Sequence, residues 1–229
     1  MCPRGALKRA VVAWAVKGLT PKVRIEMEAY AFVRRDDGTI VPYDTPGGVV
    51  YVTGTFTDLK RFTDAIWAKA QEIGLPLDLI TAEYDKPQFE FTLTFDVAVE
   101  HVDTVVLFRQ MACEIGWDRG ILLSFLPKPI LGKCGNGMHV NLSFTDRKEH
   151  NALAKGERGD PDDMNDLAKG CVAGWMRHQK AMAGLIAPNA LSYARLQPAS
   201  LSGYWCNALL QNRRKLQRLQ LPRCYRDQN

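Results

Sequence analysis

Two carboxylates, Glu26 and Glu28, stand two residues apart in the otherwise apolar segment VRIEMEAYAF, residues 23–32. Successive side chains of a strand point to opposite faces, so both carboxylates would share one face and the apolar residues the other. Two carboxylates on one face repel each other unless water, a base or a metal ion offsets their charge. An ordinary half-solvated strand of an antiparallel sheet fits the same pattern, so the pair alone leaves both interpretations open.

Two later segments repeat this alternation of apolar and polar residues. In PQFEFTLTFD, residues 87–96, Glu90 lies on the polar face, and the other face is expected to hold Phe89, Phe91, Leu93 and Phe95. In GMHVNLSF, residues 137–144, His139 takes the polar face, while Glu83 stands seven residues before Glu90. Unpaired buried anions are costly, and ligands that are mostly carboxylate suit hard ions such as Mg²⁺ or Mn²⁺. If these polar faces line one cavity, we expect a divalent cation site made of Glu26, Glu28, Glu83, Glu90 and His139.

A glycine-bounded turn precedes the histidine strand in LPKPILGKCGNGMHVN, residues 126–141. Gly135 and Gly137 would let backbone N–H groups approach a ligand closely, because glycine has no Cβ. A plain hairpin turn explains the same two glycines, so this segment supports a binding site without requiring one.

Helical spacing of apolar residues and helix start and stop signals predict four helices, over residues 4–18, 57–74, 97–117 and 162–186. The three amphipathic strands lie at 23–33, 89–96 and 138–144, a turn-rich hairpin follows at 34–48, and the stretch 187–198 is irregular. Strands with one polar face are typical of antiparallel sheets. The sequence therefore predicts an α+β fold, with helices on the apolar face of the sheet and the polar face left for chemistry.

The composition excludes several classes of protein. The chain has 229 residues and a net charge of +5. One acid, Asp227, and six basic residues after Asn212 account for this excess; the basic residues are Arg213, Arg214, Lys215, Arg218, Arg223 and Arg226. Such a tail could bind nucleic acid or supply phosphate ligands, but it lacks the interleaved aromatic residues of single-strand binders, so nucleic acid is an unlikely partner.

The six cysteines are scattered, which argues against a zinc site or a disulfide framework. No apolar run approaches about 18 residues and no signal peptide is recognisable, so we expect a cytoplasmic protein without membrane contact.

Five ordered blocks together resemble one known family. They are EMEAYAF, EYDKPQFEF, FLPKPILGKCGNGMHVNLS, PNALSYARLQP and NRRKLQR, and they resemble the catalytic domain of glutamine synthetase from about Pro3 to Arg218. The resemblance implies a partial catalytic domain over residues 1–229, built on a curved antiparallel sheet with one polar active-site face. It also implies a homo-oligomer that phosphorylates the γ-carboxylate of glutamate with ATP, after which ammonia displaces phosphate.

The resemblance assigns roles to individual residues. It implies that Glu26, Glu28, Glu83, Glu90 and His139 ligate two or more Mg²⁺ or Mn²⁺ ions. Substrate glutamate would be held by Gly135 and Arg195. The nucleotide would be contacted by Asn141, Ser143, Arg213 and Arg218. Of these residues, Arg195 and Arg213 would take part in catalysis.

Several residues depart from the family pattern. Asp85 and Pro87 replace usual glycines, Asn141 replaces a histidine, and Leu191 replaces an asparagine. Leu201 stands where typical members have the glutamate that helps to deprotonate ammonium. The family's small N-terminal domain and its last metal-binding glutamate also have no counterpart here, so we expect glutamine formation from ammonia to be impaired. A γ-glutamyl ligase for another amine, or a non-catalytic relative that binds a nucleotide or a partner protein, remain the alternatives.

Overall fold

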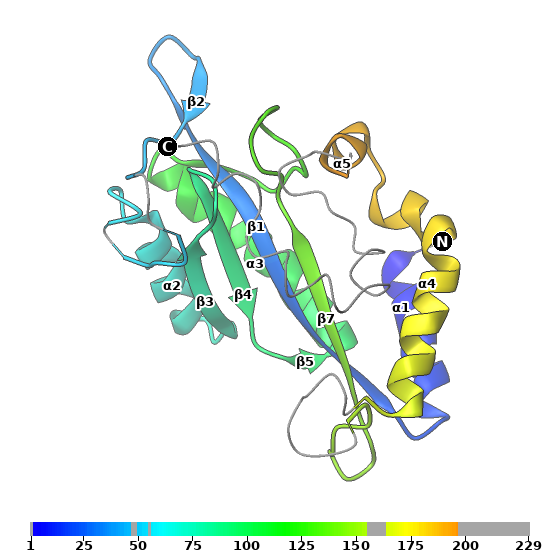
Figure 1. Cartoon of the computed structure of the whole chain (residues 1–229). Helices are drawn as coiled ribbons and strands as arrows, with labels where there is room; N and C mark the ends of the chain where they lie inside the picture. Colours follow the sequence, from blue (N-terminus) through cyan, green and yellow to red (C-terminus); the bar gives the residue numbers. More distant parts are fainter. Residues whose placement is uncertain (1, 47–49, 55, 155–163, 197–229) are drawn as a thin grey trace.

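The sheet is organised around one long strand, β1 (Thr20–Arg34), which runs through the centre of the molecule (Figure 1). A computed structural model describes residues 2–46, 50–54, 56–154 and 164–196. In this part of the chain, β1 pairs antiparallel with five strands, and β3 pairs antiparallel with β4. The other strands are β2 (Ile40–Pro42), β3 (Leu77–Ala82), β4 (Gln88–Leu93), β5 (Asp96–Val97), β6 (Leu122–Ser124) and β7 (Met138–Thr145).

Five helices accompany the sheet: α1 (Pro3–Ala15), α2 (Phe62–Glu72), α3 (Ala98–Asp118), α4 (Asp166–Ile186) and α5 (Ala190–Arg195). Figure 1 shows α2 and α3 behind the sheet, whereas α4 and α5 lie on the side of β7. Among the described residues, no helix combines the length and apolar character needed to cross a membrane.

The core forms between one face of the sheet and the helices α2 and α3. Alternate residues of β1 from Val23 to Ala31 are buried, as the sequence predicts. Aromatic rings join the layers: the Phe62 and Phe89 centroids are 5.1 Å apart, and those of Phe91 and Phe108 are 5.4 Å apart. Burying each such side chain stabilises the fold by about 1.5–3 kcal/mol. The predicted α+β architecture is confirmed, and the opposite face of the sheet carries the polar residues.

The strand predicted over 89–96 is interrupted. β4 ends at Leu93, β5 begins at Asp96, and the Phe95 side chain between them is 48% exposed. The prediction that Phe95 shares the buried face is therefore wrong. The interruption would leave the N–H of Ile25 without a strand partner, and the fully buried His101 of α3 accepts it at Nε2, 3.1 Å away.

Other boundaries also differ from the predicted ones. The helix expected from residue 57 begins at Phe62, because Asp58 accepts hydrogen bonds from Thr63 and Tyr43 and holds the preceding residues in a turn. Inside the stretch expected to be irregular, Asn189 accepts from the N–H of Ser192 and starts α5.

Neither β3 nor β6 was predicted.

The apolar face of β7 is only partly covered. Met138, Val140 and Leu142 are each more than half exposed, although they stand opposite buried residues of β1. Phe144 alone among the alternating apolar residues of β7 is buried, and its ring centroid lies 4.5 Å from that of Trp14 in α1. The alternation of β7 was thus predicted correctly, but the burial of its apolar residues was not.

We predict that His101→Leu lowers the free energy of unfolding by about 1–3 kcal/mol at pH 7.5, because a buried N–H group loses its acceptor. Burial lowers the pKa of His101 below its ordinary value of 6.5. The folded state then binds fewer protons than the unfolded state, so this histidine makes the protein less stable as the pH falls below 6.5. Urea denaturation at pH 7.5 and 5.5 should show a smaller acid-induced loss in His101→Leu than in wild type. The exposed His178 provides the control as His178→Leu, and identical pH dependence in wild type and His101→Leu would contradict the prediction.

Candidate metal centre and substrate loop

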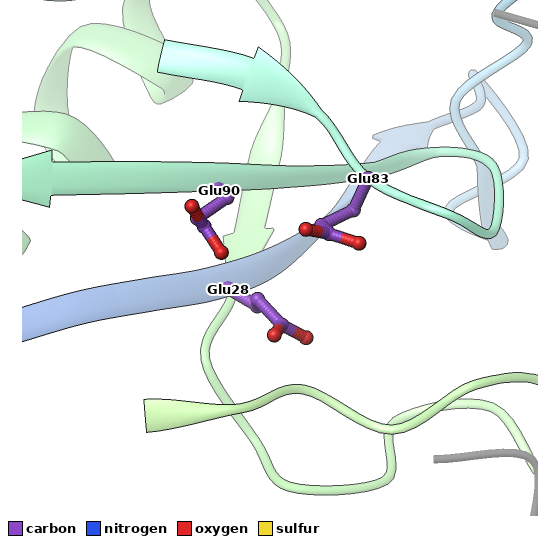
Figure 2. A group of neighbouring side chains, drawn as sticks. All are labelled: Glu28, Glu83 and Glu90. Carbon is purple, nitrogen blue, oxygen red and sulfur yellow. The ribbon is translucent and has the colours of Figure 1, made fainter. Parts of the chain in front are cut away.

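Three carboxylates from three segments meet on the polar face of the sheet. Glu28 of β1 stands directly opposite Glu90 of β4, so both side chains project from the same face. Glu83 follows the end of β3, which pairs with β4 and places Thr81 opposite Glu90. Each of the three residues offers an oxygen that lies within 4.8 Å of the other two, and Figure 2 shows the side chains directed at a common space.

Burial and mutual repulsion disfavour the charged forms of the carboxylates in this cluster. Burial and the neighbouring carboxylates of Glu28 and Glu90 raise the pKa of Glu83 to about 7. Burial and the charges of Glu26 and Glu28 also raise the pKa of Glu90. A divalent cation would offset this repulsion, and three carboxylate oxygens are the donor set that Mg²⁺ or Mn²⁺ prefers. The residues present therefore fit the ions that the sequence predicts.

The remaining predicted metal ligands adjoin this cluster. Glu26 stands opposite His139 of β7, and Nε2 of His139 lies 3.3 Å from Oε1 of Glu28. This hydrogen bond, together with the negative charges of Glu28 and Glu26, raises the pKa of His139. The structure thus brings all five predicted ligands to one surface of the sheet.

The two predicted nucleotide contacts on β7 share this polar face. Asn141 donates from Nδ2 to Oε1 of Glu26 over 3.0 Å, so it contacts one of the predicted metal ligands. Ser143 stands opposite Lys22, farther along β7 from His139. Arg213, Arg218 and Leu201 lie outside the described residues.

The glycine turn before β7 packs directly on the carboxylates. The N–H of Gly137 donates to Oε2 of Glu28 over 2.8 Å, and the N–H of Glu28 donates to the Gly137 carbonyl over 3.0 Å. A Cβ atom at position 137 would lie 2.5 Å from Oε1 of Glu28 and 2.6 Å from Nε2 of His139, closer than Cβ atoms come to other heavy atoms in proteins. A side chain at position 137 would therefore displace the ends of two predicted metal ligands, a constraint beyond the needs of a plain hairpin.

Arg195 is the last residue of α5, and its charge interacts electrostatically with His139 and Glu28. Its positive charge lowers the pKa of His139, against the stronger effect of Glu28. Burial lowers the pKa of Arg195 itself, and the negative charge of Glu28 partly offsets this shift. A guanidinium group beside the metal ligands can pair with an anionic substrate group.

Sequence reasoning missed the residues that hold the turn in place. Gln88 donates from Nε2 to Glu28 and to two acceptors in the turn, and Tyr30 donates its hydroxyl to the Cys134 carbonyl. Asp85 accepts from the N–H of Cys134 and pairs with Lys133 over 2.8 Å. The position of Gln88, two residues before Glu90, was the available signal, since strand alternation places both on the polar face.

Known proteins share both the sequence and the fold. A family model described as the glutamine synthetase catalytic domain matches residues 1–223. The chain is 30% identical over 197 residues to the glutamine synthetase of Pyrococcus abyssi, with 86% of this chain and 43% of that protein covered. It is 28% identical over 197 residues to the glutamate–methylamine ligase of Methyloversatilis universalis, with 84% and 44% covered.

Solved structures agree with these relatives. A glutamine synthase homolog, 26% identical, superposes with a TM-score of 0.72 over 85% of this chain and 43% of its own. The glutamine synthetase of Plasmodium falciparum, 18% identical, shares the fold with a TM-score of 0.73, and the superposition covers 86% of this chain and 44% of that protein. The chain spans less than half the length of these relatives. The predicted curved antiparallel sheet is confirmed, and the chain belongs to the glutamine synthetase family, within its catalytic domain.

Proposed function

We propose that this chain is the catalytic portion of an ATP-dependent ligase that joins the γ-carboxylate of glutamate to an amine through γ-glutamyl phosphate. The observation that carries this proposal is the carboxylate cluster of Glu28, Glu83 and Glu90, with His139 and the Gly137 turn packed against it. Membership of the glutamine synthetase family supports the reaction class.

The proposed reaction has two steps. An oxygen of the glutamate γ-carboxylate attacks the terminal phosphorus of ATP, and the bond from that phosphorus to ADP breaks. The nitrogen of a neutral amine then attacks the acyl carbon, phosphate leaves, and the nitrogen loses a proton to give the amide. The first step brings together two negatively charged groups, and the second releases an anionic phosphate, so positioning and charge compensation dominate the catalysis.

The predicted residues divide into three groups in this proposal. Glu26, Glu28, Glu83, Glu90 and His139 would hold Mg²⁺ or Mn²⁺, which when bound supply positive charge to the phosphoryl group being transferred. Gly135 and Arg195 would hold glutamate, so that its γ-carboxylate faces the metal ligands. Asn141 and Ser143, together with Arg213 and Arg218, would hold the nucleotide, and Arg213 with Arg195 would offset charge on the transferring group.

The identity of the amine is a separate question. Leu201 cannot accept a proton, so an ammonium ion would remain protonated and could not attack. One relative is named as a glutamate–methylamine ligase, which favours a second candidate function with an amine other than ammonia as substrate. We extend the proposal to a homo-oligomer in the cytoplasm, as the family resemblance implies.

Metal binding can be tested without activity. We predict that Mn²⁺ raises the thermal midpoint of the protein and that Glu28→Gln removes most of this shift, because an ion that binds only the folded state stabilises it by mass action. The stabilisation is about 2.7 kcal/mol at a hundredfold excess over the dissociation constant. The matched control is Glu114→Gln on the exposed surface of α3, which should shift as wild type does. An equal Mn²⁺ shift in Glu28→Gln would exclude Glu28 as a ligand.

The amine can be identified by phosphate release from ATP in the presence of Mn²⁺ and L-glutamate. We predict release close to background with ammonia, and a higher rate with an amine that is largely neutral at the assay pH, such as hydroxylamine. Leu201→Glu should raise the ammonia-dependent rate by roughly 10²–10⁴-fold, the usual value of general-base assistance, whereas Leu201→Gln should not. Fast glutamine formation by the wild type would contradict the role given to Leu201. Nucleotide and Mn²⁺ binding without turnover for any amine would favour a non-catalytic relative.

A further inference from the structure

Gln88, the first residue of β4, links the carboxylate cluster to the glycine turn. Its side chain is almost completely buried, and its Nε2 atom lies within hydrogen-bonding distance of three oxygens. These are Oε2 of Glu28 at 2.9 Å, the Gly135 carbonyl at 3.2 Å and Oδ1 of Asn136 at 3.0 Å. An amide nitrogen has two hydrogens, so Gln88 divides its donors between a predicted metal ligand and the turn.

On the side of the turn, the acceptor is held firmly. Asn136 is buried, and its Nδ2 donates to the carbonyls of Ser124 and Leu126, each over 2.8 Å. Its backbone N–H donates to the Pro127 carbonyl over 2.9 Å. Because both hydrogens of the Asn136 side-chain amide are donated to these carbonyls, the position of its Oδ1 atom is fixed. Gln88 must therefore direct its Nε2 atom, the donor, at Oδ1.

On the side of the carboxylates, Gln88 determines which oxygen of Glu28 is available. Oε2 accepts from both Gln88 and the N–H of Gly137. Oε1 instead lies beside Nε2 of His139. Hydrogen bonds of this kind orient a ligating carboxylate, and their removal typically weakens metal binding by roughly 10–100-fold.

We propose that Gln88 is a positioning residue that couples the orientation of Glu28 to the conformation of residues 135–137. A divalent cation that fixes Glu28 would thereby prepare the turn for an amino-acid substrate, and the substrate would in return tighten the cation. Such reciprocity is required whenever two ligands bias one shared element. This inference rests on the proposed function, in which the turn receives L-glutamate.

Asp85 offers a matched control from the same segment of chain. It binds the same turn, through the N–H of Cys134 at 3.0 Å and Nζ of Lys133 at 2.8 Å, but these contacts do not involve Glu28. Asp85→Ala should therefore loosen the turn at residues 133 and 134 and leave the hydrogen bonds from Gln88 and Gly137 to Oε2 of Glu28 in place, whereas Gln88→Leu should disturb both the turn and Glu28.

The test measures the dissociation constant of Mn²⁺ by calorimetry, with and without saturating L-glutamate. In wild type, glutamate should tighten Mn²⁺ by at least about fivefold, the lower end of usual coupling. In Gln88→Leu, the Mn²⁺ constant should rise by roughly 10–100-fold, and glutamate should tighten Mn²⁺ less than it does in wild type. In Asp85→Ala, glutamate should bind more weakly while the constant for Mn²⁺ alone stays as in wild type. If Gln88→Leu does not fold, Gln88→Asn keeps the amide on a shorter side chain and should show an intermediate loss of coupling.

The possible results separate the two proposals. Wild-type coupling retained in the Gln88 variants, or an unchanged Mn²⁺ constant, would overturn the role of Gln88 and leave the proposed function intact. A wild type that binds no Mn²⁺ would contradict the proposed function and the inference together. Mn²⁺ binding that glutamate never affects in wild type would overturn the coupling while leaving the metal site in place.

Discussion

Three carboxylates held close together repel one another, and this repulsion determines what the site can bind. The register of β1 with β4 puts Glu28 opposite Glu90, and the end of β3 adds Glu83, so that oxygens of all three lie within 4.8 Å. Two unit charges at this separation repel by about 3–4 kcal/mol at an effective dielectric constant of 20. Burial and this repulsion together raise the pKa values of Glu83 and Glu90. A divalent ion bound between the three carboxylates would offset their repulsion and connect β1, β4 and the end of β3.

The packing and pairing of strand β1 hold the carboxylates close together despite their repulsion. One face of β1 packs into the core against α2 and α3, and this packing fixes the backbone from which Glu26 and Glu28 project. Its long edges are paired with β4 and β5 on one side and with β6 and β7 on the other. Where that pairing is interrupted, His101 supplies the missing acceptor at Ile25, the residue before Glu26. Burial energy on one face thus supports unfavourable electrostatics on the other.

Strand alternation alone predicted much of this site. It placed Glu26 and Glu28 on one face, and it placed Glu90 and His139 on strands of the same design, which the register confirms. It failed where the backbone departs from regular pairing. β3 was missed because a register shift between Leu77 and Leu79 breaks its alternation, and Phe95 was misplaced because the strand ends before it. The bonds from Gln88 and Asp85 to the turn at 133–136 span 47 to 49 residues of sequence, and such contacts follow from tertiary packing rather than from local pattern.

Anomalous diffraction at the manganese edge, from crystals grown with Mn²⁺, would show whether Glu28, Glu83 and Glu90 hold a divalent cation. We predict an anomalous peak between these three side chains, within bonding distance of an oxygen from each, and loss of that peak in Glu28→Gln crystals. Crystals in which the three carboxylates keep their positions at saturating Mn²⁺ but show no peak between them would contradict the claim.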